Sequence, residues 1–193
     1  MANDAKDKVM FGICNVHFGT YEVDGDGNVT LGAPYHVPGS VNLSLEPDSE
    51  EVKFYADNVE YWTTYSDNGY TGELENALFD DQFKLNFMNY IQLDDGGIAQ
   101  LKGVQNKKVY MMFEAETDIA ARRCILYNLS LGQITREYAT TEASAEPQTA
   151  KLPFTVTGDN ATKITRVAYK PTDATYDSMF TTPPVPALPD ASE

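Results

Sequence analysis

Cysteine and long apolar runs are both scarce in this chain of 193 residues. The two cysteines, Cys14 and Cys124, each lie inside an apolar, strand-like run, and no CxxC spacing suggests a metal or redox site. We therefore expect two buried, reduced thiols. No apolar run approaches the length that crosses a bilayer, and the first residues, MANDAKDKVMFG, hold no apolar stretch behind a basic head. The sequence predicts no membrane partner and a protein that is made, and stays, in a cytoplasm.

The local signatures of common enzyme classes are also missing. The sequence contains no GxSxG, no Walker-type phosphate-binding loop and no GxGxxG. The only histidines, His17 and His36, are not spaced to bring two imidazoles onto one metal ion, so we expect surface or half-buried strand positions. The carboxylates of Asp80 and Asp81 fit the start of a helix better than acid/base chemistry. We predict a protein that is not an enzyme and needs no cofactor or metal.

One segment, Asp24–Asn28, resembles the beginning of a calcium-binding loop, in which oxygens at positions one, three and five converge on the ion. The remainder of the pattern fails. Position six, which needs glycine for a sharp turn, is Val29, and position twelve, which needs a bidentate glutamate, is Tyr35. The segment is therefore predicted to be a glycine-rich hairpin turn.

Positive charge is in short supply, because 14 Lys and Arg face 29 Asp and Glu, for a formal net charge of -15. A surface this acidic repels the phosphates of a nucleic acid from every side. The charge balance therefore argues against specific nucleic-acid binding.

What the sequence does contain is strand-like alternation. Tyr (12), Phe (9), Gly (13) and Pro (10) together favour strands joined by tight turns. Val41, Leu43 and Leu45 alternate with polar residues, as do Leu152, Phe154 and Val156, so each set should face one side of a sheet. The fold class predicted is all-β, a sandwich or barrel in one domain. Further strands are expected near Val9–Phe18, Val29–Val37, Lys53–Tyr55, Tyr61–Tyr65, Gly72–Leu78, Val109–Glu116, Cys124–Leu131 and Ile164–Tyr169.

One stretch has a helical period instead. Its apolar residues Phe83, Phe87, Tyr90 and Ile91 follow Asp80, a good N-cap, at i, i+4, i+7 and i+8. This predicts one flanking α-helix over Asp81–Tyr90, packed on an open face or end of the sheet.

The remaining segments are expected to carry no regular structure. Thr140–Ala145 should be a loop, and residues 182–193, with four prolines, an extended Pro-rich extension to a single domain of residues 1–181.

The densest aromatic region lies between Phe54 and Tyr70, where acidic residues separate the rings. Three interpretations remain open: ordinary core strands, a protein–protein surface with Tyr and Trp anchors, or a platform on which sugars stack. The residues concerned are Phe54, Tyr55, Tyr61, Trp62, Tyr65 and Tyr70.

The order of several segments along nearly the whole chain resembles the major tail proteins, or tail tube proteins, of non-contractile long-tailed phages (siphophages) of Gram-positive bacteria. No single segment is specific for this family, but the order of the segments along the chain is. The segments are Gly12–Phe18, Asp24–Asn28, Gly32–Pro34, Pro38–Leu45, Phe54–Asp57, Asn68–Leu74, Arg122–Asn128, Glu146–Thr149 and Thr175–Phe180.

The resemblance implies a β-sandwich or barrel subunit with a flanking helix, which assembles as homo-hexameric rings stacked into a virion tail tube. It implies that DNA passes through the lumen without specific binding, and that other tail proteins, such as the tape measure and terminator, are partners. It also implies that Glu46–Tyr70 forms a long loop or hairpin that contacts neighbouring subunits. The six aromatic residues above supply apolar area for such a contact, and we expect Trp62 to be the main anchor. The alternative is a carbohydrate-binding β-sandwich module in which Tyr61, Trp62 and Tyr65 form the stacking face.

Overall fold

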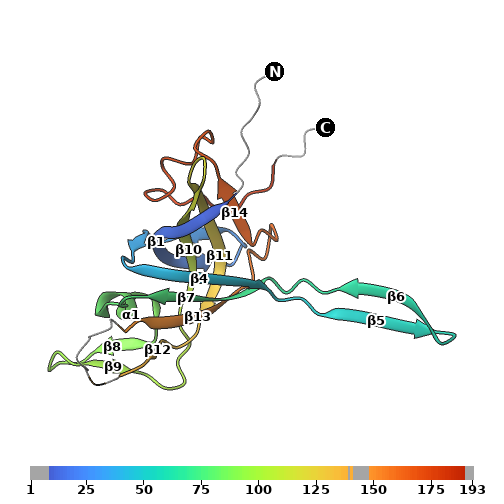
Figure 1. Cartoon of the computed structure of the whole chain (residues 1–193). Coiled ribbons are helices and arrows are strands. Elements are labelled where there is room, and N and C mark those ends of the chain that lie inside the picture. The colour runs from blue at the N-terminus through green and yellow to red at the C-terminus, as the bar shows by residue number, and fades with distance from the viewer. Residues whose placement is uncertain (1–8, 139, 141–147, 190–193) are drawn as a thin grey trace.

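The computed structural model describes residues 9–138, 140 and 148–189 (Figure 1). Most of the predicted loop at Thr140–Ala145, the first eight residues and the last four residues of the Pro-rich extension lie outside the described residues.

The described residues form short strands and a single helix, so the all-β prediction with one flanking helix is confirmed. The elements are β1 Met10–Val23, β2 Val29–Leu31, β3 Tyr35–His36, β4 Ser40–Pro47, β5 Glu51–Ala56, β6 Val59–Tyr65, β7 Tyr70–Asn76, α1 Asp81–Phe87, β8 Tyr90–Gln92, β9 Ile98–Gln100, β10 Lys108–Thr117, β11 Arg122–Leu131, β12 Thr135–Arg136, β13 Ala150–Val156 and β14 Arg166–Tyr169.

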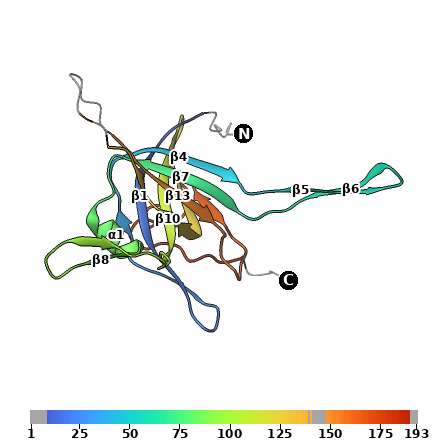
Figure 2. The same ribbon diagram turned by 90° about the horizontal axis from the view of Figure 1, so that it is seen from below.

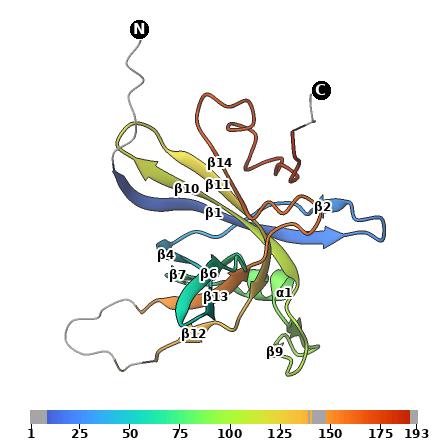
Figure 3. The same cartoon turned by 90° about the vertical axis from the view of Figure 1, so that its right-hand side faces the viewer.

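One large antiparallel sheet in the order β2-β1-β10-β11-β13-β7-β4 builds the body of the molecule. Three short strands extend this sheet, since β3 pairs with β1, β12 with β13 and β14 with β11. The sheet curls until β4, at one end of the order, lies against β1. As Figure 3 shows, β1, β10 and β11 form one layer and β4, β7 and β13 the other, which is the arrangement of a sandwich or partly closed barrel.

The bend between the layers falls at Asn128 in β11. Up to Leu126 this strand pairs with β14, and from Leu129 onward it pairs with β13. Asn128 adopts φ 56°, a left-handed conformation that asparagine tolerates better than most residues, and its Nδ2 donates to the carbonyl of Gly158 at 2.8 Å. The irregular backbone therefore lets one long strand serve both layers.

The main core lies between the two layers. The alternation predicted at Leu152, Phe154 and Val156 is confirmed, because all three side chains are buried against β1, β10 and β11. Val41 is different: β4 has a bulge between Ser40 and Asn42, and Val41 points to solvent with an exposed fraction of 55%. The prediction that Val41 shares a face with Leu43 and Leu45 is wrong for this physical reason.

The helix covers one end of the sandwich. Asp80 caps it by accepting a hydrogen bond from the backbone N–H of Phe83, as predicted, and Phe83 packs its ring 5.2 Å from that of Phe18. The helix stops at Phe87, however, and Tyr90 belongs to β8. The predicted helix end is wrong because the N–H of Asn89 donates to Asn106 Oδ1 at 2.9 Å and so leaves the helical pattern. No helix within the described ranges is long and apolar enough to cross a membrane.

A second, smaller core lies on the opposite face of β1, β10 and β11, beneath the segment that follows β14. The hydroxyl of Tyr127 donates to the carbonyl of Pro184 at 2.7 Å, and Pro186 is buried. Arg123 stacks over the rings of Tyr176 and Phe180 at 4.1 and 4.8 Å. The described part of the Pro-rich extension, residues 182–189, forms no strand and lies against the sheet.

Both cysteines are free thiols, but their surroundings differ. Cys124 is buried as predicted, whereas Cys14 is only half-buried, with its Sγ 3.9 Å from a carboxylate oxygen of Glu114. Burial and the neighbouring carboxylates of Glu114 and Glu116 raise the pKa of the Cys14 thiol. The prediction of burial is therefore wrong for Cys14.

Candidate assembly interface

Strands β5 and β6 form a two-stranded ribbon that projects far from the body and pairs with no other strand of the described chain (Figures 1 and 2). Backbone bonds continue the ladder from β4 and β7 into the ribbon. The N–H of Asp48 donates to the carbonyl of Gly69, and that of Ser66 to the carbonyl of Glu50, both at 2.9 Å. The predicted segment Glu46–Tyr70 is thus a hairpin, and its contact with neighbouring subunits stays a prediction.

The tip of the ribbon is a tight turn at Asp57 and Asn58, with φ angles of 53° and 60°. Two consecutive residues with positive φ define the type I′ turn, whose twist matches that of the flanking strands. The sequence therefore closes the ribbon locally, without help from the body of the molecule.

The apolar face of the ribbon carries Val52, Phe54 and Trp62. Cross-strand partners lie on one face of a ribbon, and the register pairs Phe54 with Trp62 and Val52 with Thr64. A bulge beside this pair makes Tyr61 an extra residue on β6, and its ring lies edge-on to that of Phe54 at 6.4 Å. The result is a cluster of aromatic rings with no covering layer.

The other face of the ribbon is polar. The ammonium of Lys53 lies 3.1 Å from Glu51 and 3.8 Å from Glu60, and the hydroxyl of Tyr65 donates to Glu51 at 3.3 Å. These pairs are exposed, and such pairs contribute little to stability in water. These pairs orient the side chains of the polar face. The apolar face is therefore the part of the ribbon whose side chains would gain most from burial against another surface.

Five of the six predicted contact residues lie on this ribbon and are exposed. The exposed fractions are 57% for Phe54, 60% for Tyr55, 73% for Tyr61, 53% for Trp62 and 66% for Tyr65. Interpreting them as core strands is therefore wrong. The sixth residue, Tyr70, lies apart in β7, where it is half-buried and packs against the main core.

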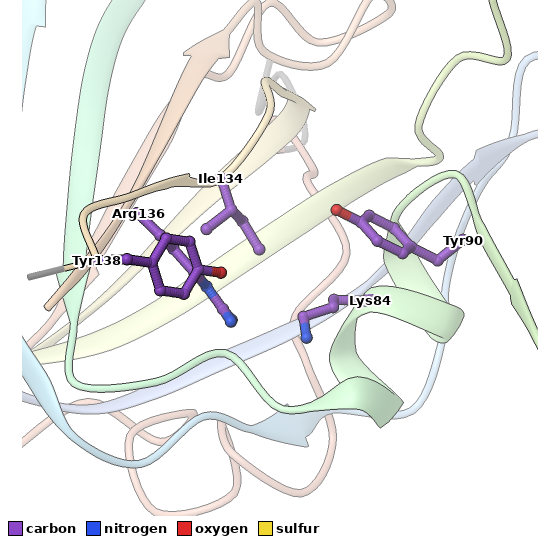
Figure 4. A pocket seen from close by; sticks show the side chains of 5 residues that line it. All are labelled: Lys84, Tyr90, Ile134, Arg136 and Tyr138. Atoms are coloured by element: carbon purple, nitrogen blue, oxygen red, sulfur yellow. The ribbon is translucent and has the colours of Figure 1, made fainter. Parts of the chain in front are cut away.

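A cationic pocket of about 350 Å³ lies on the other side of the molecule, near α1 (Figure 4). Figure 4 shows the nitrogen ends of Lys84 and Arg136 and the hydroxyls of Tyr90 and Tyr138 turned into one space, with Ile134 behind them. These residues are brought together from α1, β8 and the β12 region, which the sequence separates by about fifty positions. No local motif could have predicted the pocket.

Each cation of this pocket has a partner among the described residues. Lys84 Nζ lies 2.6 Å from Asp81 Oδ1, and its hydrogen bond and charge lower the pKa of that carboxyl. An Nη of Arg136 donates to the carbonyl of Phe79 at 3.0 Å. An ammonium has three N–H donors and a guanidinium five, so donors remain for an incoming anionic group.

The candidate metal positions have a structural explanation. Asp24–Asn28 is the turn between β1 and β2, as predicted, and Asp24 Oδ1 accepts from the N–H groups of Asp26 and Asn28. His17 and His36 face each other as cross-strand partners with ring centroids 4.8 Å apart, a proximity that their spacing did not predict. Among residues 9–138, 140 and 148–189, no three His, Cys, Asp or Glu side chains gather as a metal site would require.

No family model matches this chain, and no curated protein does. Chains in solved structures are similar to this chain over most of its length. One is from the cryo-EM structure of an extracellular contractile injection system, the PVC sheath-tube complex in its extended state. That chain is 13% identical, with a TM-score of 0.44, over 81% of this chain and 88% of the other. Another is from the tube-terminating cap of the anti-feeding prophage, 13% identical with a TM-score of 0.43, over 88% of this chain and 99% of the other.

Proposed function

We propose that this protein is a structural subunit that polymerises into a tail tube, as the major tail protein of a non-contractile long-tailed phage. In this proposal the subunits form hexameric rings that stack into the virion tail, the conduit for DNA ejection. The tape measure and terminator proteins are its other partners, and assembly takes place in the cytoplasm of the bacterial host. The subunit itself carries out no catalysis.

The observation that carries this proposal is the uncovered apolar face of the β5–β6 ribbon. A lone two-stranded hairpin is at best marginally stable in water, and three or more strands or a packed face are normally required. Phe54 and Trp62 expose more than half of their surfaces on a ribbon that pairs with no other strand of the described chain. Self-association would cover this face, and exposed apolar surfaces of this kind are typical of interaction sites.

The charge of the chain agrees with a DNA conduit. With a formal net charge of -15, an assembly of many copies repels a duplex and offers it few sites at which to stop. Repulsion is useful in a channel, because a moving polymer is slowed by every site that binds it.

Electron microscopy of the concentrated, purified protein tests the proposal directly. We expect hollow tubes with a regular axial striation and, in end views, rings with six-fold symmetry. Particles that remain single subunits at every concentration, salt and temperature tried would overturn it.

A carbohydrate-binding module is the second candidate. The stacking face expected from Tyr61, Trp62 and Tyr65 is not formed, because Tyr65 lies on the opposite face of the ribbon from Trp62. The adjacent exposed rings are those of Phe54, Tyr61 and Trp62. Sugar sites combine such rings with several polar groups that hydrogen-bond the hydroxyls. The hydroxyls of this face are those of Thr64 and Tyr61, fewer polar groups than a sugar site normally brings together. Titration with bacterial wall glycans, followed by the fluorescence of the single tryptophan, decides between them: a saturable change without tubes would favour the sugar site.

A further inference from the structure

The ribbon and the cationic pocket lie on opposite sides of the molecule. In Figures 1 and 2, β5 and β6 point away from the body in one direction, while α1 and β8 lie on the far side. Two different surfaces at opposite ends are what a head-to-tail contact needs. Repeated contacts of this kind close into rings or continue as filaments.

The charges of the two surfaces are complementary. Between Glu46 and Tyr70 the chain has seven acidic residues and one basic residue. The pocket directs two cations, Lys84 and Arg136, into one space, although the chain as a whole is strongly acidic. A cationic site on an acidic protein that self-associates has a ready partner in the acidic ribbon of another copy.

The size of the pocket limits what enters it. A volume of about 350 Å³ is at the small end of ligand sites, which span about 300–1,000 Å³. A space of this size holds one or two side chains, and its open side, where Tyr138 is 88% exposed, lets them enter. The tip of the ribbon, Tyr55–Tyr61, is the part that projects farthest, and it carries Glu60 and Tyr61 as successive residues of β6.

We propose that the ribbon tip of one copy docks into the pocket formed by Lys84, Tyr90, Ile134, Arg136 and Tyr138 on the next copy. In this contact the carboxylate of Glu60 accepts hydrogen bonds from Arg136 and Lys84, and the ring of Tyr61 packs beside Tyr90 and Tyr138. The inference rests on the proposed function and names the surface that receives the ribbon.

Charge reversal and its rescue test this contact. Glu60→Arg and Arg136→Glu are each expected to raise the critical concentration for assembly by about tenfold or more, since a buried contact becomes a like-charge contact. The double variant, with both reversals in every copy, restores the pair and is expected to assemble near the wild-type concentration. Sedimentation of a concentration series gives the three values.

Two matched controls carry the same charge changes elsewhere. Glu22→Arg and Lys170→Glu lie on exposed strand and loop positions of the body and should leave assembly within about threefold of wild type. Thermal unfolding at low concentration checks each variant for folding. If Arg136→Glu proves unfolded because it loses the bond to the carbonyl of Phe79, Lys84→Gln replaces it as the pocket variant.

A mixing experiment separates the inference from the proposed function. The two single-reversal variants each lack a different half of the contact if the inference is correct. Mixed, Glu60→Arg supplies its intact pocket to the intact ribbon of Arg136→Glu, and the reversed ribbon of the first variant meets the reversed pocket of the second. We therefore expect the mixture to associate in analytical ultracentrifugation at a concentration at which neither variant alone does. If each single variant alone forms tubes at the wild-type concentration, the inference is overturned and the proposed function still stands.

The reverse outcome is also distinguishable. Wild-type protein that forms only discrete pairs, lost on either reversal and regained in the double variant, would support the contact and overturn the tube. Wild-type protein that stays monomeric under all conditions would overturn both.

Discussion

Trp62 and Tyr65 lie on opposite faces of the same ribbon strand, so replacing each one measures a different face. Trp62→Ala removes the largest ring of the apolar face, and an aromatic anchor at an interface contributes about 2 kcal/mol or more. We expect the critical concentration for assembly to rise about 30-fold. Tyr65→Ala should have a smaller effect, because its face is polar and wet. Sedimentation measures both.

The folded subunit should tolerate the loss of Trp62, since half of this side chain already meets solvent in the single chain. Val104→Ala is a suitable control, because Val104 has a similar exposed fraction but lies away from the ribbon. If Trp62→Ala instead unfolds at low concentration while Val104→Ala does not, Trp62 belongs to a core and the interface prediction is wrong.

Asp159 makes the stability of the second core dependent on pH. Burial alone would raise the pKa of this carboxyl, yet hydrogen bonds from the hydroxyl and N–H of Thr162 and from the hydroxyl of Tyr21 hold it below its usual value. Because the folded-state pKa is depressed, the stabilisation is complete above the unfolded pKa of about 3.9. It is lost as the pH falls through the lower, folded-state value.

The measurement is urea unfolding of wild type and Asp159→Asn at a series of pH values, at concentrations too low for assembly. We expect the variant to be less stable at pH 7 by about 1–3 kcal/mol, the usual cost of losing a charged partner in a buried hydrogen-bond network. The difference between the two proteins should shrink as the pH drops below about 4. A difference that stays constant across the series would show that the Asp159 carboxylate has an ordinary pKa.

At the scale of elements, the ribbon is separable from the sheet that bears it. Ser66 and Glu50 are joined by a backbone bond of 2.9 Å at the base of the ribbon. Residues 51–65 can therefore be replaced by Asn-Gly, which closes a two-residue hairpin between strands that are already paired. We expect the shortened chain to fold with a melting temperature close to that of wild-type monomer and to form no tubes.

Circular dichroism and electron microscopy of the shortened chain give the two readouts. A second replacement of the same residues by a loop of Gly and Ser of equal length controls for chain length. Normal tubes from either chain would show that assembly does not need the ribbon. Loss of folding would show that the single chain needs the ribbon in order to fold.

The strands were the most predictable elements, because alternation with period two follows directly from burying one face of a sheet. Strands β10, β11 and β13 fall where the apolar pattern placed them, whereas β1 continues to Val23, five residues beyond the predicted end at Phe18. The local structure could not be predicted from the sequence where a residue far along the chain determines it. The bulge at Val41 and the helix end at Asn89 both depend on residues far along the chain, and no local pattern contains that information.

The candidate site divides in the same way. The aromatic density of the ribbon was visible in the sequence, but not whether those rings are buried, since core strands and exposed ribbons share one pattern. The pocket had no signal at all, because Lys84 and Arg136 meet only after β12 pairs with β13 beside α1. Composition can therefore predict an aromatic surface, but only the folded structure shows whether that surface is buried or exposed and which residues lie near it.

For the whole molecule, the two cores have different covers. The main core is enclosed by the two sheet layers and α1, while the second core is covered by the segment after β14, held by Arg123 and Tyr127. The ribbon is covered by neither. The projecting ribbon is therefore the part of the described chain whose apolar face has no cover, and under the proposed function a neighbouring copy supplies that cover.

The net charge gives the last prediction, on the interaction with DNA. At an ionic strength of about 0.01 M the Debye length is about 30 Å, so the acidic residues of the chain act together on an approaching duplex. We expect no binding of a fluorescently labelled 30-base-pair duplex by anisotropy, either to the monomer or to assembled tubes, and least of all at low salt. The opposite salt dependence distinguishes real binding, because contacts between basic residues and phosphates strengthen as salt is removed.

A histone-like basic protein at the same concentration serves as the positive control. Anisotropy that rises at low salt and falls on adding salt would show a basic surface on the assembled protein that overrides its formal charge of -15. Such a surface would hold DNA in place, and the tube could not then act as a passive conduit.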